Sequence, residues 1–187
     1  MKIRLTQRRI FVIAILIIVV VGIVWYQSTR PPEYYIVTIG GKQVPFRVDP
    51  REAASVPVYP DEASVYSLIR SPIISRIDIV FKPADEKDNP LYVVEGFEIA
   101  RKLSMLYEKW QRPPEFKSYP VDSYENLTGK LQNPIIAMIH PVYSNETAVR
   151  VQNRTIFISG TDAHKFDLAT VKFLMIAFNI TILESNI

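Results

Sequence analysis

An uncharged apolar run near the N-terminus constrains this chain more than any other feature. Residues 10–26 read IFVIAILIIVVVGIVWY, and no charged side chain follows before Arg30. A helix over this run would span about 25 Å, and its uncharged flank extends it to about 30 Å, the thickness of the apolar core of a bilayer. A helix that is apolar all round is also rare inside a domain of this size. The sequence therefore predicts a transmembrane helix at 10–26, with the lipid bilayer as its partner.

A cleaved signal peptide is the main alternative, because it also begins with basic residues followed by an apolar stretch. Three observations favour retention. The run exceeds the roughly 7 to 15 residues of a signal-peptide core, no A-x-A-like triplet follows it, and Trp25 and Tyr26 stand where an interfacial aromatic belt anchors a span. We therefore expect a retained signal anchor.

The distribution of charge predicts the orientation of this anchor. The chain has 22 Lys and Arg against 19 Asp and Glu, a formal net charge of +3. Lys2, Arg4, Arg8 and Arg9 precede the span and the first acid is Glu33, so the remainder is close to neutral. By the positive-inside rule, the N-terminus is cytoplasmic and the rest is extracytoplasmic. A neutral outer domain without a basic stripe also argues against nucleic-acid binding.

These features divide the chain into four parts. Residues 1–9 form a basic cytoplasmic tail, 10–26 the transmembrane helix, 27–33 a linker, and 34–187 an extracytoplasmic α/β domain. The linker reads QSTRPPE, and its paired prolines favour an extended, stiff spacer. The predicted location is thus the cell membrane, as a single-pass protein.

Within the outer domain, the first half predicts a hairpin, a short helix, a strand and a long helix. The hairpin runs over 34–48 around a Gly-Gly turn, and the short helix begins after Asp61 and ends before Pro72. The strand at 76–82 alternates apolar and polar side chains, which is typical of a half-buried strand. The long helix covers 91–110. The apolar stripe expected to face the core consists of Val93, Phe97, Ala100, Leu103, Tyr107 and Trp110, and the pair Glu98 and Lys102 is expected on the solvent side.

The last third of the sequence predicts the centre of the fold. Residues 134–140 form an apolar strand typical of a sheet covered on both faces, and 148–159 form a hairpin that turns at Asn153-Arg154. A nearly all-apolar helix follows from Asp162 to about Phe178. Its expected sheet-facing residues are Phe166, Ala169, Phe173 and Ala177. The fold class is therefore α/β: one transmembrane helix followed by one compact α/β sandwich with a mixed sheet.

Residue types that carry chemistry are scarce. The chain has no Cys and two His, and it contains no nucleophile motif and no P-loop, so we expect no catalytic residue, no cofactor and no metal. His140, His164 and Asp167 are weak metal candidates if the strand end meets the helix start. The acidic loop at 85–89 is expected to be solvated, and Glu95 with Glu98 is expected on an exposed ion-paired face beside Arg101.

Four N-x-[ST] sequons fit an outward-facing domain. Asn126, Asn145 and Asn153 fall in predicted loops or turns, where they are candidate glycosylation sites, whereas Asn179 lies at an expected buried helix end. Together with the absence of Cys, the abundance of Ile and the scarcity of Gly, this composition is typical of a prokaryotic, archaeal-type envelope protein.

The sequence leaves three classes of function open. The leading hypothesis is a non-enzymatic binding or accessory component of a cell-envelope complex, with an envelope or membrane protein as its partner. A surface-filament subunit is the second, because pilins also begin with basic residues and an apolar helix. However, their processing site has Gly or Ala before that helix, and here Arg9 meets Ile10 directly. A membrane-tethered enzyme of unspecified reaction is the third.

Overall fold

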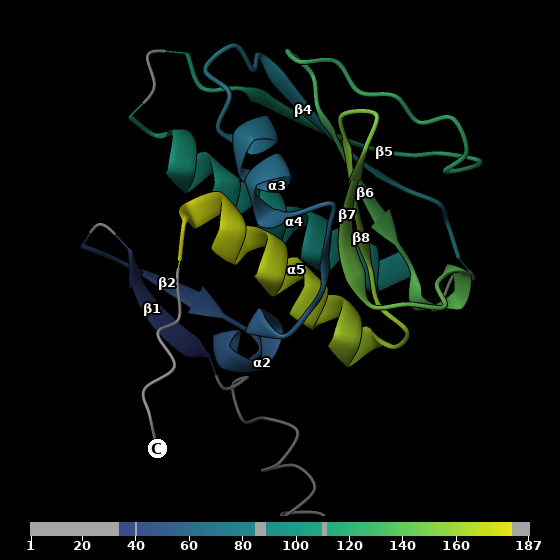
Figure 1. Cartoon of the computed structure of the whole chain (residues 1–187), viewed down its shortest axis with the longest axis horizontal. Coiled ribbons are helices and arrows are strands. Elements are labelled where there is room, and N and C mark those ends of the chain that lie inside the picture. The colour runs from purple at the N-terminus through teal and green to yellow at the C-terminus, as the bar shows by residue number, and fades with distance from the viewer. Residues whose placement is uncertain (1–33, 40, 85–88, 110–111, 181–187) are drawn as a thin grey trace, which may run out of the picture. The chain divides into compact units, whose positions relative to one another are not determined.

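Two separate sheets and a layer of helices make up the part of the chain that the structure describes (Figure 1). The computed structural model describes residues 34–39, 41–84, 89–109 and 112–180. The predicted span at 10–26 and most of the acidic loop lie outside these ranges. Over the described ranges, no helix is long and apolar enough to cross a membrane.

The predicted N-terminal hairpin is confirmed and forms a sheet of its own. Strand β1 (Tyr35–Ile39) pairs antiparallel with β2 (Lys42–Phe46), with Ile39 opposite Lys42. Gly41 in the turn has φ 81°, which glycine adopts without strain. Val44 and Phe46 point into the main core, so the hairpin covers part of the helical layer.

The second sheet is mixed and has six strands, which confirms the predicted mixed α/β domain. Its strands in chain order are β3 (Val58–Tyr59), β4 (Arg76–Phe81), β5 (Glu115–Pro120), β6 (Ile135–Ile139), β7 (Ala148–Gln152) and β8 (Thr155–Ser159). In space the order is β3-β7-β8-β6-β4-β5. Strands β5, β4, β6 and β8 run parallel, β7 pairs antiparallel with β8, and β3 runs parallel to β7. The edge strands β3 and β5 are not among the sequence predictions.

Both faces of the sheet are covered, but by different structures. On one face, alternate residues such as Ile77 and Ile79 pack against the helices. On the other face, Val80 packs beneath Tyr124 and Leu127 of the segment between β5 and β6. The prediction that β4 is half-buried was therefore wrong, because this segment covers a second face that a local pattern cannot reveal.

The helices are α2 (Pro50–Ala54), α3 (Glu62–Ile69), α4 (Asn89–Tyr107) and α5 (Ala163–Phe178), with a 3₁₀ turn η1 (Pro141–Tyr143). The predicted cap of α3 is confirmed, since Asp61 accepts a hydrogen bond from the Ser64 N–H at 2.7 Å. Asp162 caps α5 through the Lys165 N–H at 2.8 Å. Both caps satisfy amide groups that the first helical turn would otherwise leave unpaired.

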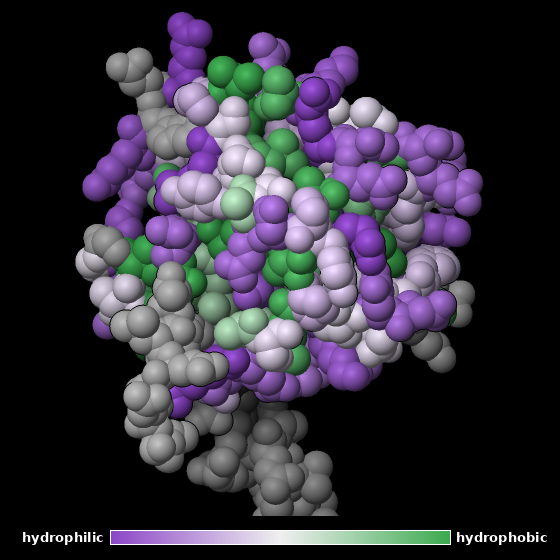
Figure 2. Space-filling model, viewed as in Figure 1, coloured by the Kyte–Doolittle hydropathy of each residue, from purple (hydrophilic) through white to green (hydrophobic). Residues whose placement is uncertain are grey.

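Helix α5 is the central helix, as predicted. It contacts α2, α3, α4, β7 and β8, and every residue from Leu168 to Phe178 is buried. In Figure 1 it runs in front of α4, and the same view in Figure 2 shows apolar surface only as patches between hydrophilic side chains. The apolar side chains of α5 are therefore buried in the core.

Helix α4 departs from its predicted orientation. Leu103 and Tyr107 are buried as expected, but Val93 and Phe97 are 68% and 69% exposed. The buried face instead runs through Tyr92, Ile99 and Leu103. The helix thus carries two apolar stripes, and only one of them is used by the core.

Candidate functional site

The unused stripe of α4 lines a groove beside the edge strand β5. Val93, Phe97 and Ala100, spaced at i, i+4 and i+7, form the helical wall of a hollow of about 410 Å³. Its floor and opposite wall come from alternate residues of two strands: Ile79, Phe81, Phe116, Ser118 and Pro120. We call this the α4–β5 groove. A folded domain seldom leaves such large apolar side chains together in water, so the groove is the strongest candidate binding surface.

A small residue opens this groove at its base. Gly96 lies on α4 between Val93 and Ala100, and a Cβ placed there would come within 3.2 Å of the Met138 side chain. Glycine therefore lets α4 approach the sheet closely at this point. The adjacent Tyr92 stacks on Phe81 with ring centroids 5.0 Å apart, which supports the inner end of the groove.

Among the described residues, β5 is the last strand of its sheet and presents a free backbone edge along the same groove. The Glu115 N–H donates to Ser75 at 2.9 Å and the Val121 N–H donates to Phe81 at 2.8 Å, so odd-numbered residues of β5 face β4. Successive backbone groups alternate in direction, and the N–H groups of Phe116 and Ser118 therefore point away from the sheet. Sequence reasoning missed this strand. Its signal is a short stretch bounded by prolines at positions 114 and 120.

A second feature is a buried ionic cluster between the hairpin and the helices. The guanidinium of Arg47, just after β2, donates a hydrogen bond to the Glu95 carboxyl group of α4 at 2.8 Å, and Glu95 is only 2% exposed. Lys102 is fully buried, pairs with Glu98 and lies 4.3 Å above the Phe46 ring. The prediction that this face of α4 is exposed was wrong, because the hairpin, distant in sequence, folds over it.

Burial changes the acid–base properties of this cluster. Desolvation is the largest cause that raises the pKa of Glu95 to about 8, and repulsion from Asp167 and Glu98 adds to it. Burial also raises the pKa of Asp167 and lowers that of Lys102. Glu95 is therefore largely protonated at neutral pH. Neither Glu95 nor Asp167 lines the α4–β5 groove or the pocket described next, so this acid pair does not open onto a described hollow that could admit a substrate.

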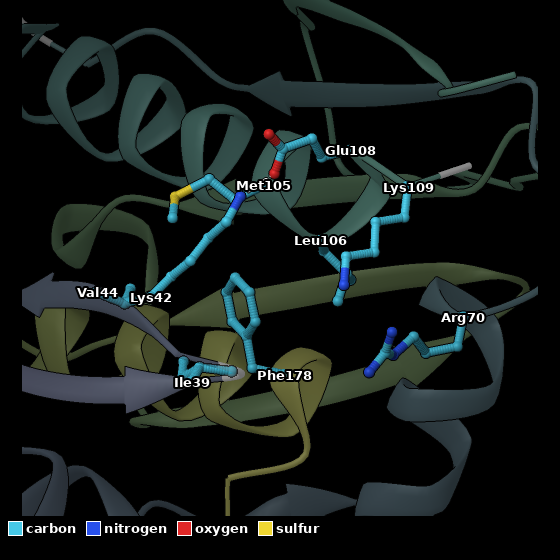
Figure 3. Close-up of a pocket in the computed structure, with 9 residues that line it drawn as sticks. All are labelled: Ile39, Lys42, Val44, Arg70, Met105, Leu106, Glu108, Lys109 and Phe178. Carbon is cyan, nitrogen blue, oxygen red and sulfur yellow. Dashed lines mark hydrogen bonds and ion pairs between the residues drawn. The ribbon is translucent and has the colours of Figure 1, made fainter. Parts of the chain in front are cut away.

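A smaller pocket of about 320 Å³ lies between the hairpin and the C-terminal ends of α3, α4 and α5 (Figure 3). Lys42 extends to an ion pair with Glu108, while Arg70 and Lys109 approach the same space from the opposite side of Phe178. Its apolar lining is Ile39, Val44, Met105, Leu106 and Phe178. The excess of cations over carboxylates suits a small anion.

The predicted metal candidates are not brought together. His140 is buried against Tyr92, and its Nδ1 accepts a hydrogen bond from the Val142 N–H at 3.2 Å. His164 is exposed and lies 3.1 Å from Glu52, and Asp167 belongs to the ionic cluster. Among the described residues, no group of three or more His, Cys, Asp or Glu side chains is arranged to hold a metal ion.

All four sequon asparagines are exposed. Asn126 and Asn145 lie in loops, and Asn153 occupies the β7–β8 turn with φ 50°. Asn179 caps the end of α5 with φ 56°, so the expectation that it is buried was wrong. The helix is buried as far as Phe178, whereas the cap residue Asn179, in the left-handed conformation, faces outward.

These observations define a mixed α/β domain whose helices cover one face of a six-stranded sheet and whose edge strand borders an apolar groove. No protein-family model, curated protein or solved structure matches the chain.

Proposed function

We propose that this chain is a membrane-anchored, non-enzymatic binding protein of the cell envelope, and that its outer domain binds a protein partner in the α4–β5 groove. One observation carries the proposal: Val93 and Phe97 expose about two thirds of their surface at 68% and 69%, side by side on one helical stripe. A few well-packed residues supply most of the affinity in protein interfaces, and aromatic residues such as Phe are enriched there.

Two further features support binding over catalysis. The groove is lined mainly by apolar side chains, and Ser118 is the polar residue that β5 contributes on the groove face. The neighbouring acids Glu95 and Asp167 lie in the ionic cluster among α4, α5 and the hairpin instead. Such an arrangement favours association with an apolar surface over chemistry on a small substrate.

Site-specific photo-crosslinking tests this function. A photoreactive phenylalanine analogue placed at Phe97 in the full-length protein, in its native membranes, is expected to give one discrete adduct with another envelope protein. The adduct should disappear when Val93→Ser is added, because that change removes half of the exposed stripe. Tyr66 of α3, an exposed aromatic on another helix, provides the matched control position.

The identity of the adduct separates the classes of function. An adduct with a second copy of this chain would favour the filament subunit. Equal labelling from positions 66 and 97, or an adduct that survives Val93→Ser, would contradict the groove as the binding surface.

A further inference from the structure

We infer that the partner enters the groove as an extended strand that pairs with β5. We also infer that this strand carries an acidic residue between two apolar residues. Both statements rest on the proposed function. Three features lead to this conclusion: the open backbone edge of β5, its flanking prolines and the position of Lys117.

The backbone of β5 can accept one more strand. Phe116 and Ser118 each direct an N–H and a C=O away from β4, and β5 is the last strand of its sheet. A strand laid along this edge would satisfy these groups and would lie next to the apolar wall of α4. Addition of a strand beside a helix is an established mode of peptide recognition.

Prolines limit this edge to a short segment. Positions 114 and 120 also face outward by the same alternation, and both are proline, which has no N–H to donate. Only two outward donors therefore remain, at Phe116 and Ser118. This arrangement permits a brief, specific pairing and discourages the long edge-to-edge association that leads to aggregation.

Side-chain alternation then sets the chemistry of the partner. Phe116 and Ser118 pair in register with Ile77 and Ile79, on the face that holds the groove. Partner residues opposite these two positions would place their side chains in the groove, and apolar side chains fit there. The intervening partner residue would point to the other face, opposite Lys117.

Lys117 is suited to a carboxylate from outside the chain. It pairs in register with Asp78, but Asp78 is already held by Arg76 at 2.9 Å and accepts a hydrogen bond from the Tyr119 hydroxyl at 3.3 Å. The remaining neighbour, Glu115, is 3.6 Å from the Lys117 ammonium, and both side chains are about half exposed. An acid directly opposite Lys117 would add a favourable cross-strand pair.

The same charge disfavours a second copy of this chain as the occupant. An antiparallel pairing of two β5 strands that uses both donors places Lys117 opposite the Lys117 of the other copy. Like charges directly opposite each other destabilise a strand pair. The strand that fits is therefore a different sequence, with the pattern apolar–acidic–apolar.

A designed peptide tests the inference on the full-length protein in lipid nanodiscs. The probe is a dye-labelled, end-blocked peptide Gly-Thr-Val-Glu-Val-Thr-Gly, and fluorescence anisotropy reports binding. Ser118→Pro removes an outward N–H without touching the ladder to β4, so it should weaken binding about tenfold. Ser118→Ala is the matched comparison, because it keeps that N–H and should bind more tightly than Ser118→Pro.

Charge reversal supplies a second, independent test. A peptide with Lys in place of Glu should bind the native protein about threefold more weakly, and Lys117→Glu should reverse this preference. Thermal melting by circular dichroism verifies that each variant is folded.

The outcomes separate this inference from the proposed function. If position 97 yields the expected adduct but the peptide does not bind, or binds Ser118→Pro and Ser118→Ala equally, the strand-pairing inference is overturned and the groove remains a binding surface. If the adduct is also absent, both fail.

Discussion

Glu95 illustrates how the setting of a residue depends on segments far away in the sequence. Its local neighbours Glu98, Arg101 and Lys102 indicate an exposed, ion-paired helical face. In the structure, only Arg101 of these four side chains is exposed, because the β1–β2 hairpin brings Phe46 and Arg47 over the others. A buried carboxyl group needs a hydrogen-bond partner, and Arg47, 48 positions away in the chain, is that partner.

The raised pKa of Glu95 predicts a pH-dependent stability. Glu95 holds a proton up to about pH 8 when folded, whereas the unfolded chain releases it above about pH 4.5. Between these values the folded state binds more protons, so stability should fall as the pH rises, by at least about 1 kcal/mol between pH 5 and pH 8. Chemical denaturation at a series of pH values measures this slope.

Two variants assign that slope to Glu95. Glu95→Gln keeps the size and hydrogen-bonding capacity of the side chain but cannot ionise, so its stability should vary less over this range. Glu115→Gln removes an exposed acid and should keep the native slope. A native protein that becomes more stable from pH 5 to pH 8 would contradict the prediction.

At the scale of elements, local sequence patterns predicted the helices and turns that are stabilised by residues close together in the chain. Asp61 and Asp162 cap helices through their own first turns, and Asn153 with Arg154 turns the β7–β8 hairpin through positive φ angles of 50° and 57°. Strands β3 and β5 depend on pairing with partners distant in the chain, and β3 has only two residues. No local periodicity could reveal them.

The sequence of α4 did not reveal the α4–β5 groove, because a helical pattern does not say which apolar face the fold buries. The predicted stripe joins Val93 and Phe97 to Leu103 and Tyr107, but in the structure the first two side chains are exposed and the last two are buried. Tyr92 and Ile99 mark a second apolar face on the same helix, and tertiary packing buried that one. A helix with two apolar faces is itself a signal that one of them has another role.

Helix α5 provides the element-scale prediction. Phe173 is fully buried near its middle, so Phe173→Ala should leave a cavity that the fold cannot refill and reduce the free energy of unfolding by about 3 to 5 kcal/mol. His164 is exposed beside Glu52 at 3.1 Å, and His164→Ala should change stability by no more than about 0.5 kcal/mol. Thermal and denaturant unfolding of the two variants give the comparison.

The two variants also test the role of α5 itself. Tolerance of Phe173→Ala would mean that α5 is peripheral, contrary to its contacts with five other elements. Loss of metal or ligand binding in His164→Ala would require a role for that side chain beyond the exposed contact with Glu52.

At the scale of the whole molecule, the proposals join two kinds of information. The apolar run at 10–26 and the basic residues before it predict an anchor and its orientation from composition and spacing alone. The groove depends on tertiary structure, since it joins residues of α4 to those of β4 and β5. Anchoring favours binding, because a tethered domain meets membrane-bound partners at a raised effective concentration.

Limited proteolysis of intact cells tests the predicted topology. Because the positive-inside rule predicts a cytoplasmic N-terminus, protease added outside is expected to digest the domain at 34–187 and leave a small protected fragment that contains 10–26. Detergent-lysed cells are the control, in which the N-terminal tail also becomes accessible. A domain that survives in intact cells but is digested after lysis would reverse the orientation.

Mass spectrometry of the membrane fraction tests whether the anchor is retained. A retained anchor requires a mature chain that begins near Met1, and a mature start at 27–30 would identify a cleaved signal peptide.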